Sequence, residues 1–413
     1  MLSAITRLHT AVPALVLLGV LAGPAAADVV SDWNAKAEAI AIEKRLLPPP
    51  NARGMAILHV AMFEAVNAVD HRYAPYRLKL MADQTVSKEA AAAAAAHAVL
   101  AALHPDQQAS LDSTLKASLA TIADGEPKAK GIELGKKAAA EVLALRADDS
   151  ASAPEAYRPA TTAGVYVPTI IPVSSVDGAV TPWVMKTGSQ FRPAPPPALD
   201  SPTWTSDVNE IRELGSMRST KRTAEQTEIA RFWFMIGPRA WNPMVRQLEA
   251  LKKLDVVDSA RLFALVAMAS HDAFIAVFDA KYQYNFWRPV TAIRNADLTG
   301  NKATPRDPSW LPLGDTPMHP EYPCAHCITS AAVGGILKGL FGNDIPEVAM
   351  TSPTAPGVTR KWTRIDDYSQ EVALARIYAG FHYRNSNKVG DDMGRKIAEL
   401  TLATQLRAAE ALR

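Results

Sequence analysis

Apolar residues recur every three or four positions over most of the chain, a pattern typical of helices that bury one face. In the first 150 residues this pattern predicts four helices, over 51–69, 87–103, 110–122 and 128–145. Further along it predicts seven more, over 207–216, 224–233, 243–253, 258–281, 325–341, 366–381 and 389–409. No alternating stretch is long enough to predict a sheet, although Val165–Val184 is compatible with a short hairpin. We therefore expect an all-α fold.

Prolines divide these helices into two groups. Ten of the 30 prolines lie between Ala151 and Thr205, and prolines disfavour helix interiors. The segment 61–69 also resembles 269–277, at an offset of 208 residues. We expect two related helical bundles, 28–150 and 207–413, joined by a long proline-rich connection over 151–206.

The N-terminal 27 residues have the three parts of an export signal. Arg7 is the only charged residue before Asp28, an apolar run covers Ala11 to Ala22, and three alanines end at Ala27. We predict a signal peptide over 1–27 and a periplasmic or secreted mature protein; an uncleaved membrane anchor is the alternative. We expect no later segment to contain the roughly 18 apolar residues that a membrane span needs.

Composition narrows the class of protein. With 48% hydrophobic and 21% charged residues the chain is expected to build a globular core, which excludes a disordered protein. Lys and Arg number 44 against 42 Asp and Glu, a net charge of +2, so nothing indicates a nucleic-acid partner. The sequence leaves the oligomeric state open and allows a homo-oligomer.

Basic residues gather in three short segments of the C-terminal half. Lys281 and Arg288 frame the end of an apolar helix, His326 lies where a proline-stiffened loop opens another, and Arg376 precedes His382 by six residues. Six residues do not share one helical face, so the helix predicted over 366–381 must end or bend between them, which Gly380 allows. Guanidinium groups, histidines and a helix N-terminus together predict a site for a tetrahedral oxyanion.

In order, these segments read Lys281-x6-Arg288-Pro289, then Pro323-x-x-His326, then Arg376-x5-His382. This resembles the superfamily of vanadium-dependent haloperoxidases and type 2 phosphatidic-acid phosphatases (acid phosphatases). The resemblance implies an anion site in the C-terminal bundle and vanadate as cofactor.

The resemblance also implies roles for individual residues. His382 would be the vanadium ligand, or the nucleophile that becomes phosphohistidine in a phosphatase, and His326 the acid–base residue. The groups expected to bind the vanadate or phosphate are Lys281, Arg288, Cys324, Ala325 and Arg376. Two activities follow: a haloperoxidase that oxidises halide with hydrogen peroxide, or a periplasmic acid phosphatase (phosphomonoesterase) acting on a phosphate ester. The missing membrane spans and the large N-terminal half argue against an integral-membrane lipid phosphatase, and the haloperoxidase is the first interpretation.

The chain departs from the superfamily pattern at several positions. Cys324 and Ala325 replace the usual Ser and Gly, so a thiol stands where a hydroxyl donor is expected. Ser386 stands where many peroxidases have an Asp that orients the ligand histidine, and Asn385 or Asn387 is the expected substitute. These changes leave an inactive, anion-binding protein as a further possibility.

The two cysteines carry a separate hypothesis. Cys324 and Cys327 have a spacing that permits a local disulfide, a thiol redox centre or half of a metal site, with His326 and His319 as further ligands. A metal-dependent phosphohydrolase centred on His271-Asp272 is a weaker alternative, because that pair lies on an apolar helix and is better explained as a packing pair.

Overall fold

The computed structural model describes residues 28–155 and 157–409, so the predicted signal peptide lies outside the described residues. The N-terminal half contains α1 (Val29–Glu43), α2 (Pro48–Asp70), α3 (Lys88–Leu103), α4 (Gln108–Ala120) and α5 (Glu126–Leu145). The C-terminal half contains α6 (Pro202–Leu214), α7 (Ala224–Phe232), α8 (Asn242–Lys252), α9 (Val256–Tyr284), α10 (Pro289–Arg294), α11 (Ala325–Phe341), α12 (Ile365–Tyr378) and α13 (Arg384–Thr404). Between α11 and α12 an antiparallel hairpin pairs β1 (Asp344–Ser352) with β2 (Ala355–Arg364). The predicted all-α class is confirmed, with this hairpin as its one named sheet in the described residues.

All eleven predicted helices are present, most with shifted ends. The largest differences at a helix start are at α6 and α13, and α6 begins at Pro202 because Ser201 accepts a hydrogen bond from the Trp204 amide and caps it. Proline is well tolerated in the first turn of a helix, where its missing N–H has no partner to lose. Two helices, α1 and the short α10, were not predicted.

The hairpin lies elsewhere than expected. No strand forms over 165–184, where the structure has an isolated bridge between Val165 and Phe286 and a single 3-10 turn. The actual strands contain Pro346 and Pro356, which favour a loop in a sequence reading. In a two-stranded sheet each strand is an edge strand, where a proline costs no ladder hydrogen bond if its nitrogen faces outward.

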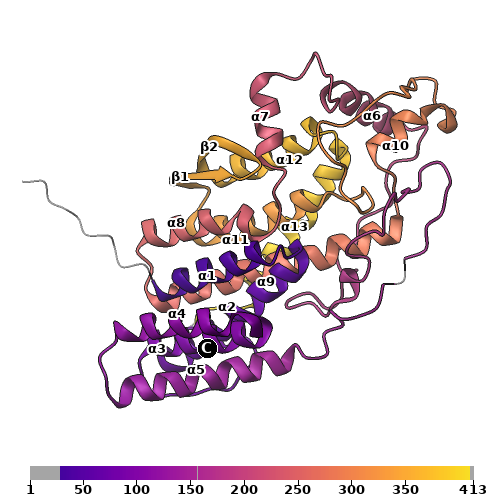
Figure 1. Ribbon diagram of the computed structural model, residues 1–413. Coiled ribbons are helices and arrows are strands. Elements are labelled where there is room, and N and C mark those ends of the chain that lie inside the picture. The colour runs from indigo at the N-terminus through magenta and orange to yellow at the C-terminus, as the bar shows by residue number, and fades with distance from the viewer. Residues whose placement is uncertain (1–27, 156, 410–413) are drawn as a thin grey trace, which may run out of the picture.

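The central helix of the fold is α9. It packs against α2 of the N-terminal half and against α11 and α13 of the C-terminal half, and one hydrophobic core runs through both halves (Figure 1). The sequence analysis expected no membrane-spanning length after the export signal, but α9 is long and apolar enough to cross a membrane by length and composition alone. In this fold 94% of its most apolar stretch is buried within the protein, as in the core helix of a soluble domain.

The predicted relation between the halves is visible in their packing. Helices α3 and α5 pack with α2 as α11 and α13 pack with α9. A Cβ on Gly131 of α5 would lie 2.5 Å from the Ser87 carbonyl oxygen at the start of α3, and one on Gly390 of α13 would lie 2.7 Å from the Cys324 carbonyl oxygen at the start of α11. Both helix pairs therefore touch backbone to backbone at the same relative position. Figure 1 shows α3 and α5 at the opposite end of the molecule from α12.

The acidic residues of the repeated segment have matching structural roles. Asp272 of α9 accepts hydrogen bonds from the backbone N–H groups of residues 183–185, at 2.7–2.9 Å. Glu64 of α2 accepts from the N–H groups of residues 77 and 78. His271 accepts a hydrogen bond from the indole of Trp183 at 2.8 Å. His271 and Asp272 therefore hold the connecting segment onto α9, as a packing pair does.

Candidate functional site

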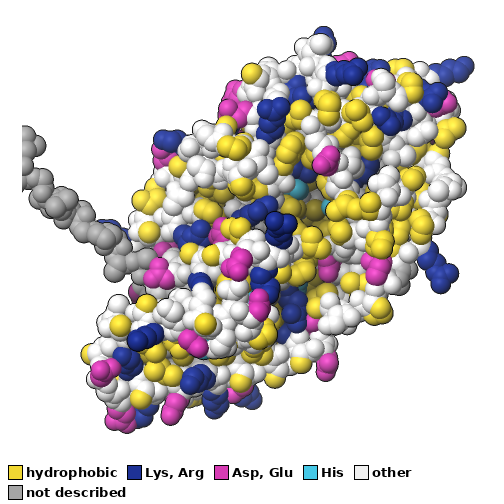
Figure 2. Space-filling view, viewed as in Figure 1, with side chains coloured by type: hydrophobic (Ala, Val, Ile, Leu, Met, Phe, Trp, Pro, Cys, Tyr) yellow, Lys and Arg dark blue, Asp and Glu magenta, His cyan; other side chains and the backbone are white. Residues whose placement is uncertain are grey.

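A pocket of about 700 Å³ opens where α11 begins and α12 ends. Four of the residues that line it are histidine or arginine and come from three different segments: His319, His326, Arg376 and His382. Figure 2 shows histidine side chains deep in a hollow whose surroundings are mainly hydrophobic. The predicted motifs thus converge on one cavity.

Helix ends deliver the basic side chains to this pocket. α9 ends at Tyr284, and Arg288 is extended because it precedes Pro289, the first residue of α10. α12 ends at Tyr378, and Gly380 takes a left-handed backbone (φ 81°) in which its own Cβ would collide with the Gly215 carbonyl oxygen. The expected helix end at Gly380 is therefore confirmed, and it turns His382 back toward Arg376.

Arg288 connects three parts of the site. Its Nη1 donates to the Phe381 carbonyl at 3.0 Å and lies 3.2 Å from Nε2 of His382. Its Nη2 lies 3.0 Å from Nδ1 of His319, and its Nε donates to the carbonyl of the same residue. His319, which sequence reasoning considered only as a metal ligand, is therefore part of the anion site's surroundings.

Arg376 lines the pocket with unused donor capacity. Its Nη1 donates to the Trp233 carbonyl at 2.7 Å. Its buried Nε has no hydrogen-bond partner among the described residues. A buried, unpaired guanidinium N–H is costly, so this group is poised to bind an acceptor in the pocket.

His382, the predicted vanadium ligand, is oriented by a residue that sequence reasoning missed. Nδ1 of His382 lies 2.8 Å from Oε1 of Glu321, which also accepts the Tyr383 N–H at 3.1 Å. With the Nδ1 proton donated to the carboxylate, Nε2 carries the lone pair and faces Arg288. Asn385 and Asn387 do not perform this task. The Asn385 backbone N–H donates to Asp207, and the Asn387 side chain donates to the Ala373 carbonyl.

Glu321 lies in the His-Pro-Glu-Tyr-Pro loop, directly before the cis Tyr322-Pro323 bond, and its side chain is fully buried. In the sequence, Glu321 is marked only as an acidic residue three positions before Cys324, inside a proline-rich loop. A carboxylate in such a loop is usually interpreted as solvent-exposed, so its role was not predicted.

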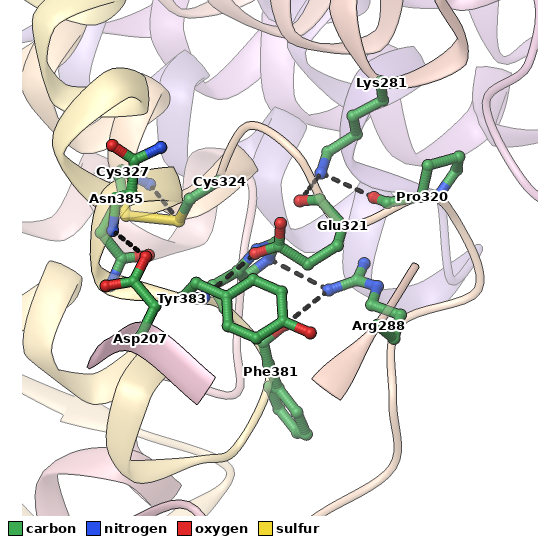
Figure 3. Close-up of polar contacts among 12 residues, drawn as sticks. Asp207, Lys281, Arg288, Pro320, Glu321, Cys324, Cys327, Phe381, Tyr383 and Asn385 are labelled. Carbon is green, nitrogen blue, oxygen red and sulfur yellow. Dashed lines mark hydrogen bonds and ion pairs between the residues drawn. A yellow bond between two sulfur atoms is a disulfide. The ribbon is translucent and has the colours of Figure 1, made fainter. Parts of the chain in front are cut away.

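Lys281 holds the loop that carries this carboxylate. Its Nζ donates to the backbone carbonyls of Pro320 and Glu321, both at 2.8 Å (Figure 3). Lys281 is not among the residues lining the pocket. It contributes positive charge next to the site and fixes the position of Glu321.

His326 and the cysteines lie at the start of α11. Nε2 of His326 lies 3.2 Å from the Met235 carbonyl and donates to it, which leaves Nδ1 for a ligand. Cys324 caps the helix, accepting the Cys327 N–H, and its sulfur is bonded to Cys327 in a disulfide. Cys324 therefore has no thiol to donate to an anion, unlike the residue expected from the sequence. Ala325 opens the helix, so its N–H is not used within α11.

The site has a strong excess of buried positive charge. Lys281, Arg288 and Arg376 are 0%, 1% and 1% exposed, and the carboxylate of Glu321 interacts electrostatically with Lys281 and Arg288. Burial and the neighbouring cations lower the pKa of Arg376 to about 9 and the pKa of Lys281 well below its usual value. Burial beside these cations also lowers the pKa of His382, which is therefore neutral. Even with the charge on Lys281 weakened by burial, two charged arginines against one carboxylate favour a bound anion.

The disulfide also removes the metal-centre hypothesis. Oxidised Cys324 and Cys327 cannot supply thiolate ligands, and no group of three or more His, Cys, Asp or Glu able to hold a metal ion occurs within 28–155 and 157–409.

Comparison with known proteins gives a consistent result. The family model for the VCPO second helical-bundle domain matches residues 261–410. Vanadium chloroperoxidase from Curvularia inaequalis is 25% identical, over 82% of this chain and 74% of that protein. The first bacterial vanadium-dependent iodoperoxidase structure is 24% identical, covers 92% of this chain and 97% of its own, and has a TM-score of 0.80. The holo-type bacterial vanadium-dependent chloroperoxidase structure is 16% identical and covers 86% of this chain and 92% of its own, with a TM-score of 0.65.

The matched domain covers all three basic motifs, and the solved structures share the fold over most of their length. These similarities agree with the resemblance that the ordered motifs indicate, and with their convergence on one pocket. Residues 261–410 match the VCPO second helical-bundle domain, and the chain over most of its length is similar to vanadium-dependent haloperoxidases in sequence and in fold.

Proposed function

We propose that this chain is a vanadate-dependent haloperoxidase that oxidises halide with hydrogen peroxide. The observation that carries the proposal is the buried cluster in which Arg288 and Arg376 surround a histidine with a fixed tautomer. In that cluster His382 keeps its Nε2 lone pair toward Arg288 while Glu321 holds its Nδ1 proton. The curated relative is a vanadium chloroperoxidase and the solved neighbours are haloperoxidases, which favours this activity over a phosphatase.

The residues present fit vanadate. The anion would meet the unpaired Nε of Arg376, the neutral His382 and an uncompensated excess of buried positive charge. His382 would be the ligand, and Arg288, Arg376 and the N–H groups at the start of α11 would hold the oxygens. Bound vanadate supplies a Lewis acid that activates hydrogen peroxide toward halide.

The protein's own groups manage protons and charge. His326, neutral because burial lowers its pKa, can accept a proton from bound hydrogen peroxide and return it as water leaves. Lys281 and the two arginines offset the negative charge that develops on oxygen. The overall reaction balances as halide, hydrogen peroxide and one proton giving hypohalous acid and water, with the halide oxidised by two electrons.

We also propose that the mature protein is exported to the periplasm or the medium. The Cys324–Cys327 disulfide supports this location, because disulfides persist mainly in oxidising compartments. Fractionation of the producing cells, with N-terminal sequencing of the mature protein, tests both the location and the predicted cleavage after Ala27.

Two assays on purified protein, each with and without orthovanadate, test the activity. One follows bromide oxidation by hydrogen peroxide and the other follows p-nitrophenyl phosphate hydrolysis, both alongside His382→Ala. We expect vanadate-dependent bromide oxidation that the variant lacks. Hydrolysis of the phosphate ester that vanadate inhibits, with no bromide oxidation, would instead establish the phosphatase.

A further inference from the structure

The pocket above the anion site has a wall that halide oxidation does not require. Apart from its polar floor, the lining is largely apolar and includes Phe234, Ile236, Val290, Leu313 and Phe381. Hydrogen peroxide and a halide ion are a few atoms in size and gain little from contact with such a wall. A volume of about 700 Å³ instead falls in the range of sites for organic ligands.

The wall is partly aromatic and reaches the reactive floor. The rings of Phe234 and Phe381 are 5.6 Å apart between centroids, with 35° between their planes. The guanidinium carbon of Arg376 lies 4.8 Å from the centroid of the Phe381 ring, and Phe381 directly precedes His382. A third aromatic ring placed against this pair would therefore lie over the anion site, in the offset or edge contact that aromatic rings favour.

The charges of the pocket select among aromatic ligands. Of the residues that line it, Asp315 is the one carboxylate, and it is exposed. The floor is cationic, so an anionic aromatic compound would compete with vanadate for Arg376. A cationic aromatic compound would be repelled by the positive charge of the same floor. The lining therefore fits a neutral ring with apolar substituents, such as an alkylphenol.

We propose that the pocket binds the organic acceptor, a neutral and electron-rich aromatic compound of the alkylphenol class, and that halogen transfer takes place there. This inference rests on the proposed haloperoxidase function. The step balances as Ar–H plus hypohalous acid giving Ar–X plus water. A carbon–halogen bond forms, the oxygen–halogen bond breaks, and the ring proton leaves with the hydroxide.

A competition experiment tests where the halogen is transferred. The vanadate-loaded enzyme, with bromide and hydrogen peroxide, receives equal amounts of 4-propylphenol and 4-(2-hydroxyethyl)phenol, two neutral phenols whose side chains differ mainly in polarity. Slow addition of reagent hypobromous acid to the same mixture gives the product ratio set by ring reactivity alone. We expect the enzyme to enrich brominated 4-propylphenol roughly tenfold over that ratio, because only the apolar tail gains from burial in the pocket.

Variants locate the selection on the wall. Phe234→Ala should bring the ratio close to that of the reagent, whereas Phe234→Leu should retain most of the enrichment because an apolar group of similar size remains. Met81→Ala removes an apolar side chain that is 77% exposed and does not line the pocket, so it should retain the wild-type ratio. Because both phenols compete in one mixture, the ratio does not depend on the rate of each variant.

A binding measurement separates this proposal from the proposed function. Saturation-transfer difference NMR on vanadate-free protein should show contact with 4-propylphenol that Phe234→Ala loses and Phe234→Leu keeps. Bromination at the reagent's ratio overturns the proposal while leaving the haloperoxidase function intact. Lack of saturation transfer in the wild-type protein also overturns it. Saturation transfer without any bromination supports the binding site and refutes the haloperoxidase function.

Discussion

Glu321→Gln tests the orientation of His382 with the smallest change of shape. The carboxylate accepts two hydrogen bonds through Oε1, from the His382 ring and the Tyr383 backbone. A glutamine oxygen can accept the same two bonds, so packing in this fully buried position is kept. The variant removes the negative charge that strengthens the bond to the imidazole.

The expected loss follows from the strength of that bond. Hydrogen bonds to charged groups contribute about 1.5–3 kcal/mol and neutral ones about 0.5–1.5 kcal/mol. A difference of about 1–2 kcal/mol corresponds to a decrease in turnover of roughly 5-fold to 30-fold, which overlaps the range of roughly 10-fold to 100-fold seen when partners of metal-binding histidines are changed. The variant also lowers the negative charge beside the bound anion, which strengthens vanadate binding. The assay must therefore use saturating vanadate and compare kcat for bromide oxidation.

The pH dependence gives the prediction a second signature. Burial raises the pKa of Glu321 to about 7, while Lys281 and Arg288 pull it down. A protonated Glu321 has lost the negative charge that strengthens its bond to the imidazole, so wild-type turnover should fall as the pH drops through about 7, and Glu321→Gln should lack this dependence. Stability changes in the opposite direction. Because the pKa in the folded state exceeds the ordinary 4.5, the contribution of Glu321 to stability is present below pH 4.5 and lost as the pH rises toward 7. A loss of activity at low pH is therefore not a loss of folding caused by this group.

Glu347→Gln is the matched control, since Glu347 pairs with Lys361 on the exposed surface of the hairpin and should have no effect. If Glu321→Gln kept the wild-type kcat and the same fall in turnover at low pH, the assigned role of Glu321 would be refuted.

Three further predictions follow from the packing around the site. Replacing Cys324 and Cys327 together by Ser should restore a hydroxyl donor and tighten vanadate binding about threefold to tenfold by calorimetry, and weaker binding would contradict this expectation. Loss of the four-residue disulfide loop should also lower the free energy of unfolding by about 2 kcal/mol. Gly394→Ala places a Cβ 2.3 Å from the Ile328 carbonyl oxygen, and should destabilise by about 2 kcal/mol in thermal unfolding after the helix-propensity gain is subtracted. Gly54→Ala, whose Cβ has room, should instead stabilise slightly, and equal effects would contradict the packing argument. Arg376→Lys keeps the charge but loses the fork, so vanadate affinity should fall at least about tenfold by the same calorimetry, and unchanged affinity would contradict its role.

Helical periodicity was sufficient to predict the fold class and eleven of the helices, because their buried faces repeat at helical spacing. The same rule missed the hairpin, since Pro346 and Pro356 obscure its alternation and edge strands tolerate proline. α1 shows helical spacing as well, with Val30, Trp33 and Ala37 buried, but it directly follows the apolar segment assigned to export.

The site was predictable as far as its motifs have fixed spacing. His326, Arg376 and His382 line one pocket, with Arg288 directly behind, and the ordered motifs were sufficient to expect that. The carboxylate partner of His382 was not predictable from spacing. The superfamily pattern places it four residues after the histidine, at Ser386, whereas here it comes from Glu321, which is 61 residues earlier in the chain and meets His382 only after folding. The roles of the pocket residues toward the anion, and those of Lys281 and Ala325, stay predictions.

Soaking crystals of the protein with orthovanadate, and locating vanadium by its anomalous scattering, tests the central claim most directly. The account predicts one vanadium site in the pocket, bonded to Nε2 of His382 and within hydrogen-bonding reach of Arg376 through its oxygens. Vanadium bound elsewhere, or no vanadium in this pocket at saturating concentration, would contradict it.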